Sequence, residues 1–198
     1  MKKNNLYWII IACGILIIFG ANLVSNFTIQ TFLYCILTLC IVVIPCIIFV
    51  FVLEFMPKKL FDANKKIFHV FKFENKFYEK MKIKKWKEKI PTIKSVKTGF
   101  DKTKIISKSP DYLLQFLTEN CKAETGHAIS VLWGLISIIF AIFILPKHNV
   151  LTVWLPVVIL NTLFHYGPIA IQRYIRPRLL RLYNTSLKEN EVELEKRN

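Results

Sequence analysis

Long stretches without any charged side chain constrain this chain more than any other feature. The stretches Leu6–Val24 and 29–53 contain no Asp, Glu, Lys or Arg, and neither do the stretches 128–145 and 150–171. A helix of about 20 apolar residues crosses the roughly 30 Å hydrocarbon core of a bilayer. The composition agrees, since 54% of the 198 residues are hydrophobic. We therefore predict an all-α integral membrane protein with four transmembrane helices.

The first stretch raises the question of a cleaved signal peptide. Lys2 and Lys3 precede it, as basic residues precede the apolar part of a signal peptide. The second apolar stretch follows almost at once, with no small-x-small cleavage site and polar mature domain between the two, which favours an uncleaved first helix. We predict a transmembrane hairpin over 1–56, with spans at about 6–24 and 29–53.

Positive charge lies almost entirely on one side of the predicted spans. All but Lys147 of the 28 Lys and Arg residues precede span one, lie between spans two and three, or follow span four. The positive-inside rule then makes the chain a multi-pass protein of the cell membrane with both termini cytoplasmic. The net charge of +15 suits membrane lipid with anionic headgroups, whereas nucleic acid is not an expected partner.

The region 57–109 is a basic, aromatic, cytoplasmic or interfacial loop between the second and third helices. Ile67, Phe71, Tyr78 and Met81 recur in it at helical spacing, which predicts an amphipathic helix lying in the membrane interface. A second interpretation makes the same region one wall of a cytosol-facing site that holds an anionic donor by its phosphates.

The region 110–180 predicts a long helix that enters span three, at about 128–145, without a break, followed by span four at about 150–171. Ser109 is a good N-cap and Pro110 suits the first helical position. At about 100° per residue, one face of this helix carries a set of apolar and polar residues. They are Leu113, Leu117, Asn120, Glu124, His127 and Val131.

Glu124 and His127 stand three residues apart where this helix should enter the bilayer. Their side chains are therefore neighbours on the helix. Transfer of a carboxylate or an imidazole into the hydrocarbon core has a high free-energy cost, which disfavours contact with lipid. We expect both to face protein or a wet cavity.

Span four also has a polar face, and arginines follow it. That face carries Trp154, Asn161, His165, Pro168 and Gln172. Arg173 and Arg176 come next, in a chain that otherwise prefers lysine, and a guanidinium makes planar bidentate contacts that an ammonium does not. A charged, solvated helix is predicted for the C-terminal tail over 181–198.

Neither a metal site nor a disulfide is predicted. The pair Glu124 and His127 would need more ligands to hold zinc. The five cysteines show no paired metal-ligand spacing, and disulfides are not expected in this setting. We expect no tightly bound cofactor.

Three segments resemble motifs of one enzyme family. They are Lys82–Pro91 (KIKKWKEKIP), Glu119–His127 (ENCKAETGH) and Gln172–Leu179 (QRYIRPRL), and they occur in the family's order. Over about Lys58–Leu180 the chain thus resembles the glycosyl-4,4'-diaponeurosporenoate acyltransferases. That family attaches a fatty acyl chain to the sugar of a glycosylated carotenoid in the synthesis of staphyloxanthin. The resemblance implies acyl transfer to the sugar of a glycosylated lipid.

This resemblance gives roles to the polar residues. Acyl transfer from a thioester to a hydroxyl needs a general base, for which His127 is the candidate, with Glu124 as its orienting partner. Asn161 and His165 are candidate polar partners from span four. An acyl-CoA or a similar acyl donor serves as co-substrate. Five residues are expected to bind its phosphates and adenine: Lys84, Lys85, Trp86, Arg173 and Arg176. Gln172, Asn161 and His165 are further candidate substrate-binding residues.

Three alternatives stay open. Glu124 and His127 can form a purely structural hydrogen bond at a helix-packing seam. The protein can be a non-catalytic membrane adaptor that binds anionic lipid through 57–109. The acceptor can be another glycolipid, because the chain differs from the family motifs at four positions. Those positions are Asn120, Lys122, Ala128 and Ile175.

Overall fold

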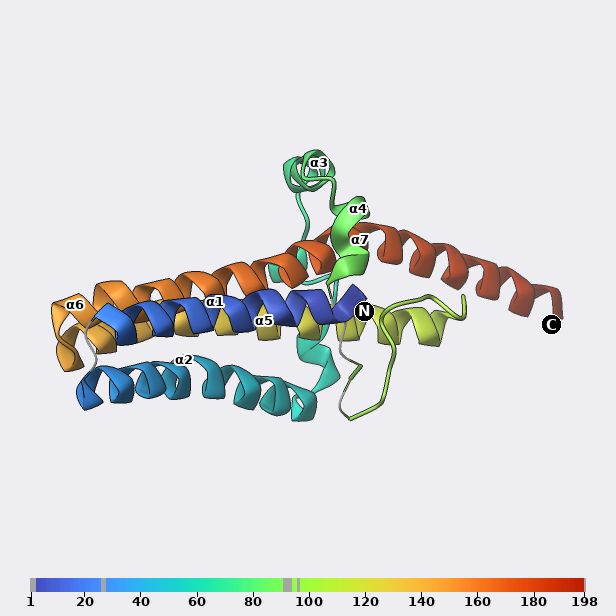
Figure 1. The fold of residues 1–198 in the computed structure, drawn as a ribbon. Coiled ribbons are helices and arrows are strands. Elements are labelled where there is room, and N and C mark those ends of the chain that lie inside the picture. The colour runs from blue at the N-terminus through green and yellow to red at the C-terminus, as the bar shows by residue number, and fades with distance from the viewer. Residues whose placement is uncertain (1–2, 26–27, 91–93, 96, 198) are drawn as a thin grey trace. The chain divides into compact units, whose positions relative to one another are not determined.

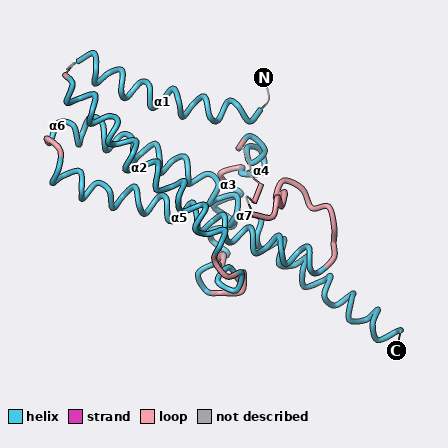
Figure 2. Tube along the Cα trace, turned by 90° about the horizontal axis from the view of Figure 1, so that it is seen from below, coloured by secondary structure: helices cyan, strands magenta, loops and turns pink. Residues whose placement is uncertain are grey.

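The computed structural model describes residues 3–25, 28–90, 94–95 and 97–197. All regular structure in these residues is helical, and loops connect the helices (Figure 2). Lys2 and Pro91, which entered the sequence argument, lie outside the described residues. The chain divides into two compact units, which are treated one at a time. The first contains Met1–Leu53, Lys89–Pro91 and Gly126–Pro168, and the second contains Glu54–Glu88, Thr92–Thr125 and Ile169–Asn198.

The first unit is built from long apolar helices. Two of them come from the N-terminal part of the chain, α1 (Lys3–Ser25) and α2 (Ile29–Phe55). The later part of the chain forms α5 (Pro110–Ile144), the short α6 (Lys147–Asn149), the π-helical turn η4 (Val150–Trp154) and α7 (Leu155–Arg197) (Figure 1). Of α5 only the part after Thr125 belongs to the first unit, and of α7 only the part up to Pro168. The predicted long helix thus begins at Pro110, as the cap residues indicated.

Three described helices are long and apolar enough to cross a membrane. They are α2, α5 and the helical stretch Lys147–Lys196, while Ile9–Ser25 of α1 is a shorter apolar helix. Apolar side chains on the outside of α1, α5 and α7 are exposed: Leu16 is 68% exposed, Phe143 84% and Leu163 64%. Large exposed apolar surfaces suit a lipid environment and are rare on soluble monomers. The structure therefore agrees with three to four of the predicted spans.

The interior of the first unit combines an apolar cluster with hydrogen bonds between helices. Trp154 is fully buried in that cluster and donates from Nε1 to Ser137 Oγ at 3.0 Å. Trp133 Nε1 donates to the Ile41 carbonyl at 2.7 Å. Indole is suited to this position because it is largely apolar and carries a single donor that needs one acceptor.

Gly134 marks a close approach between α5 and α7. A Cβ at this position would lie 2.8 Å from Asn161 Nδ2, the atom that donates to the Ser130 carbonyl at 3.0 Å. We expect Gly134→Ala to displace Asn161 and to destabilise the protein by about 1–2 kcal/mol, the usual cost of overpacking and of a lost interhelical hydrogen bond. Thermal unfolding in detergent measures it. Gly20→Ala is the matched control, since a Cβ at Gly20 has nothing within 4 Å, and equal losses in both variants would contradict the close approach.

The second unit contains the short helices of the central region together with the first part of α5 and the second part of α7. Its short elements are η1 (Lys58–Phe61), η2 (Lys66–Phe68), α3 (Lys72–Lys80), α4 (Ile83–Trp86) and η3 (Lys87–Lys89). In α7 the helix continues to Arg197, so the tail predicted from 181 is a continuation of the preceding helix.

The amphipathic helix predicted from Ile67 to Met81 is shorter than its periodicity indicates. Helix α3 begins only at Lys72, and Lys82 adopts a φ of +55° that separates α3 from α4. Tyr78 is buried against Ala170 and Tyr174 of α7, whereas Ile67 is 74% exposed. Helix α3 therefore packs one face on α7 and leaves its aromatic edge outside.

Candidate functional site

The residues predicted from the sequence fall into both units. His127, Asn161 and His165 belong to the first unit. The second unit holds the remaining members, which are Lys84, Lys85, Trp86, Glu124, Gln172, Arg173 and Arg176.

Two histidines from different helices of the first unit meet side by side. His127 of α5 and His165 of α7 place their Nδ1 atoms 2.8 Å apart, with ring centroids 5.1 Å apart and an interplanar angle of 46°. His165 is 8% exposed, and its ring also makes an edge contact with Phe164. We call His127 and His165 the imidazole pair. At this distance one Nδ1 donates a proton and the other accepts it.

Asn161 lies one helical turn before His165 and holds the same two helices together. Its Nδ2 donates to the Ser130 carbonyl, and its Oδ1 lies 3.8 Å from the Cys46 sulfur. This amide is therefore engaged with the protein itself. It fixes the relative position of α5 and α7 next to the imidazole pair.

Both carboxylate oxygens of Glu124 are bound by arginines within the second unit. Arg173 Nη1 donates to Glu124 Oε1 at 2.7 Å, and Arg176 Nη2 donates to Glu124 Oε2. Glu124 is 7% exposed and Arg176 is fully buried. A buried carboxylate is stable only when it is paired and hydrogen-bonded, and the two guanidinium groups meet that need.

The remaining donors of Arg176 are also used inside the protein. Its Nε donates to Asn120 Oδ1 at 3.0 Å and its Nη1 to the Phe68 carbonyl at 2.9 Å. Asn120 in turn donates to Gln172 Oε1. The sequence interpretation assigned Arg176 to the acyl donor and Gln172 to substrate binding, and the structure places both in this buried network. We call Asn120, Glu124, Gln172, Arg173 and Arg176 the arginine cluster.

Glu74 of α3 anchors Arg173 from the other side. Arg173 donates from Nε and Nη2 to the two oxygens of Glu74, at 2.7 and 2.9 Å. The same carboxylate accepts the Phe71 backbone N–H at the start of α3 and the Tyr78 hydroxyl. The hydrogen bonds from Arg173 hold the pKa of Glu74 below its usual range, and those bonds raise the pKa of Arg173 in return.

We expect Glu74→Gln to lower stability by about 1–2 kcal/mol at neutral pH, because charged hydrogen bonds to Arg173 are lost. The pKa of Glu74 is lower in the folded state than in the unfolded state. The carboxylate therefore contributes fully to the free energy of unfolding above the unfolded-state pKa of about 4.3, and this contribution is lost as pH falls through the folded-state pKa. Chemical unfolding between pH 7 and pH 3 measures this, and the difference from wild type should shrink at acidic pH. Glu79→Gln, on the exposed side of α3, is the control. A difference that stays constant down to pH 3 would contradict the role of the Glu74 carboxylate.

The residues of the KIKKWKEKIP segment differ in exposure. Lys84 and Lys85 of α4 are exposed. Trp86 packs against the apolar cluster of the second unit, and its Nε1 donates to the Met81 carbonyl at 3.0 Å. The two lysines are thus available to an anionic ligand, whereas the indole N–H is already satisfied.

A buried ion cluster in the second unit was missed by the sequence interpretation. Lys122 donates to Glu54 and to Glu119, each at 3.2 Å, and Ser95 also donates to Glu54. Burial lowers the pKa of nearby Lys102, an effect that the charges of Glu119 and Glu54 oppose. The available signal was the spacing of Glu119 and Lys122, which puts them on neighbouring helical positions.

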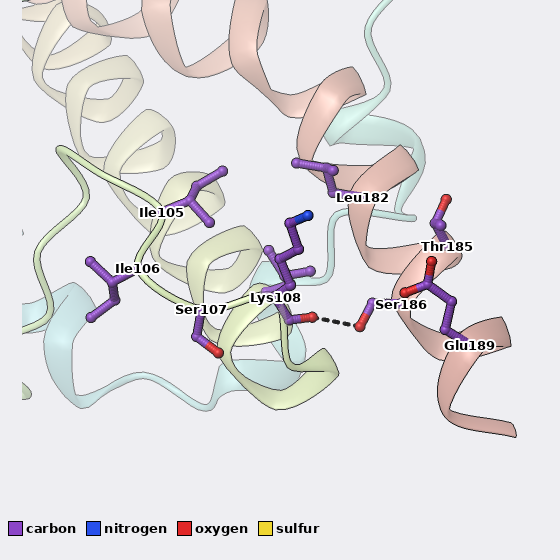
Figure 3. Close-up of a pocket in the computed structure, with 9 residues that line it drawn as sticks. Ile105, Ile106, Ser107, Lys108, Leu182, Thr185, Ser186 and Glu189 are labelled. Atoms are coloured by element: carbon purple, nitrogen blue, oxygen red, sulfur yellow. Dashed lines mark hydrogen bonds between the residues drawn. The ribbon is translucent and has the colours of Figure 1, made fainter. Parts of the chain in front are cut away.

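Two cavities open in the second unit, and they differ in their relation to the predicted residues. The larger, of about 450 Å³, is lined by none of them; there Ser186 Oγ donates to the Lys108 carbonyl (Figure 3). The smaller, of about 330 Å³, is bordered by Arg176, His69 and Arg181 on an otherwise apolar wall. Of the two, only the smaller cavity is therefore lined by a residue of the predicted site, which is Arg176. In the described residues no group of three or more His, Cys, Asp and Glu is placed to hold a metal ion.

The comparisons with known proteins match this chain to a protein family. The family model described as glycosyl-4,4'-diaponeurosporenoate acyltransferase matches residues 64–185. This stretch includes all three segments on which the resemblance was based, and it confirms that resemblance. No curated protein and no solved structure matches the chain.

Proposed function

The chain belongs to the glycosyl-4,4'-diaponeurosporenoate acyltransferase family, and from this premise we propose that it moves a fatty acyl group from an acyl thioester to a sugar hydroxyl of a glycosylated lipid. A glycosyl carotenoid is the acceptor that the family suggests. The acyl donor is acyl-CoA or a similar thioester.

His127 is the proposed general base. It accepts the proton of the sugar hydroxyl while that oxygen attacks the thioester carbonyl carbon, which forms a tetrahedral oxyanion. Collapse of this intermediate breaks the carbon–sulfur bond and leaves the ester. The departing thiolate then takes the proton from the His127 imidazolium, so the enzyme returns to its starting state.

The observation that carries this proposal is the setting of His127. Its imidazole is half-buried on a helix apolar enough to cross a membrane, and a second imidazole lies 2.8 Å away. Ionisable groups at such positions are costly in free energy, so their presence there points to function. Imidazole is also the side chain whose unperturbed pKa suits proton transfer near neutrality.

The arginine cluster has a supporting role in the proposal. Arg173 and Arg176 neutralise Glu124, and Arg173 also ties α3 to α7, so the two arginines stabilise the second unit. Arg176 also borders the 330 Å³ cavity with Arg181. We assign that cavity, together with exposed Lys84 and Lys85, to the anionic head of the acyl donor.

The membrane arrangement belongs to the same proposal. The helices that could span a membrane support a multi-pass protein, and the distribution of basic residues supports termini on the cytoplasmic side. An acceptor anchored by an isoprenoid chain would then reach the enzyme within the bilayer. The acyl thioester would reach it from the cytosol.

Lipid mass spectrometry of a strain that lacks the gene tests the function. We expect one acylated glycolipid to disappear and its non-acylated precursor to accumulate, and the gene supplied on a plasmid should reverse both changes. An unchanged set of acylated lipids would contradict the proposed function. The mass of the missing species would also identify the acceptor and the acyl chain.

An exposed aromatic edge favours a second candidate function, that of a non-catalytic adaptor on anionic membrane. Phe71, Phe73 and Phe77 are 52%, 69% and 50% exposed beside the lysines of α3, and Phe71 stacks on Phe73 at 5.7 Å. Such a surface is typical of segments that insert into a charged membrane surface. An adaptor would keep its function in a His127→Ala variant, whereas an acyltransferase would lose it.

A further inference from the structure

The imidazole pair allows only certain proton arrangements. Two neutral imidazoles whose Nδ1 atoms lie 2.8 Å apart share one proton at that contact. If His127 donates, its Nδ1 carries the proton and its Nε2 carries the lone pair. If His165 donates, His127 carries its proton on Nε2 and has no lone pair there to act as a base.

Acyl transfer distinguishes these two arrangements. A general base needs its lone pair on the nitrogen that faces the hydroxyl, and Nδ1 of His127 already faces His165. A His127 that acts as the base while its Nδ1 faces His165 takes the proton on Nε2, so Nδ1 has to be the donor. When His127 becomes an imidazolium, its bond to His165 turns into a charge-assisted one, which is stronger.

A neutral acceptor suits this location better than a carboxylate does. His165 is 8% exposed on a helix that could span a membrane, where an unpaired carboxylate would be expensive. Both oxygens of Glu124, the partner expected from the sequence, already accept from arginines. In catalytic triads a buried acceptor at the remote nitrogen of the base fixes its tautomer, and a neutral imidazole can do the same.

The surrounding contacts hold His165 in place. Asn161, four residues before it on α7, donates to the carbonyl of Ser130, which lies three residues after His127 on α5. Gly134 allows the two helices to approach closely at the next turn. The ring of Phe164 contacts that of His165 at a centroid distance of 4.9 Å. The acceptor is thus held by packing as well as by its own hydrogen bond.

We propose that His165 is the positioning residue of the acyl transfer reaction: it accepts a hydrogen bond from His127 Nδ1–H and so keeps the lone pair of His127 on Nε2. This inference rests on the proposed function, since it assigns the proton needed by the base. It replaces Glu124 as the orienting partner of His127.

Substitutions at His165 separate a positioning role from a packing role. The amide oxygen of His165→Asn comes close to the position of Nδ1 and can accept the same bond, whereas His165→Leu fills the space and accepts none. We expect His165→Leu to lower kcat on the order of 100-fold with KM changed by less than about 2-fold, in keeping with the loss of a tautomer-fixing group. His165→Asn should recover kcat to within about 10-fold of wild type. Equal kcat values for the wild type and His165→Leu would overturn the assignment.

A second measurement determines directly which ring nitrogen of His127 carries the proton, and it does not depend on enzyme activity. Nitrogen-15 NMR of histidine-labelled protein in lipid nanodiscs should show His127 with its proton on Nδ1 in the wild type. In His165→Leu the same residue should show a mixture of tautomers. A wild-type His127 with its proton on Nε2 would overturn the proposal even if the enzyme is active. If the NMR result holds while the wild type transfers no acyl group, the proposed function fails and the proton arrangement stands.

Discussion

Replacing His127 with alanine is expected to lower kcat for acyl transfer by roughly 100- to 10,000-fold, the range that a lost general base produces. The same change leaves the buried His165 without this hydrogen bond, so stability should fall by about 1–3 kcal/mol. Activity and stability therefore respond very differently. The measurement is the rate of ester formation by purified protein in nanodiscs, with thermal unfolding recorded on the same samples.

His148→Ala is the matched control for this prediction. His148 lies in α6 and is exposed, so its removal should leave both kcat and stability within about 2-fold and 0.5 kcal/mol of wild type. If His127→Ala and His148→Ala retain the same activity, His127 is not the base. If His127→Ala unfolds, its loss of activity says nothing of catalysis, and His127→Gln takes its place as a variant of similar size.

Replacing Arg176 with methionine is expected to destabilise the protein by about 3–5 kcal/mol, the largest loss of stability that the structure predicts. The side chain is fully buried, and its removal leaves acceptors at Glu124, Asn120 and the Phe68 carbonyl without their donor. Unsatisfied buried acceptors carry the full cost of their lost hydration. Unfolding of the purified protein in detergent, followed by circular dichroism against denaturant, measures the change.

Arg178→Met tests whether position in the QRYIRPRL segment or burial sets that cost. Arg178 is exposed and contacts Tyr174 over the ring face, at 5.2 Å from the centroid. We expect it to cost no more than about 1 kcal/mol. Arg176→Lys should fall between the two, because it keeps the charge but not the planar fork. Equal losses for Arg176→Met and Arg178→Met would contradict the structure of the arginine cluster.

Local sequence patterns predicted the helices well, because helix formation depends largely on residues that are near one another in the chain. Pro110 begins α5 as its cap signals indicated, and the predicted polar face of that helix is buried at Asn120 and Glu124. Apolar runs long enough to cross a bilayer likewise became helices. These features follow from periodicity and composition alone.

Partner choice was harder to predict, because it depends on the packing of distant segments. Glu124 binds arginines 49 and 52 residues further along the chain, and Arg173 binds Glu74 at a separation of 99 residues. No local pattern selects among such partners. The spacing of Glu124 and His127 suggested that Glu124 orients His127. In the structure Glu124 accepts hydrogen bonds from two arginines, and His165 lies beside His127.

The central region shows a second limit of pattern reasoning. Its helical spacing from Ile67 to Met81 suggested one helix, but the 3₁₀ turn Lys66–Phe68 and the extended backbone of His69 and Phe71 delay the start of α3 to Lys72. The left-handed conformation of Lys82 then separates α3 from α4. Lysine carries no sequence signal for a positive φ, which is uncommon outside glycine and asparagine. The position of Glu74, which binds Arg173 from this segment, depends on that division.

One measurement tests the central claim most directly: mass spectrometry of the products formed when purified protein in nanodiscs receives an isotope-labelled acyl thioester and a glycosylated isoprenoid lipid. We predict that the wild-type protein forms a labelled sugar ester and releases the free thiol in equal amount. The folded His127→Ala protein should form neither above background. Absence of labelled ester with the wild type, or the same yield from both proteins, would contradict acyl transfer by His127.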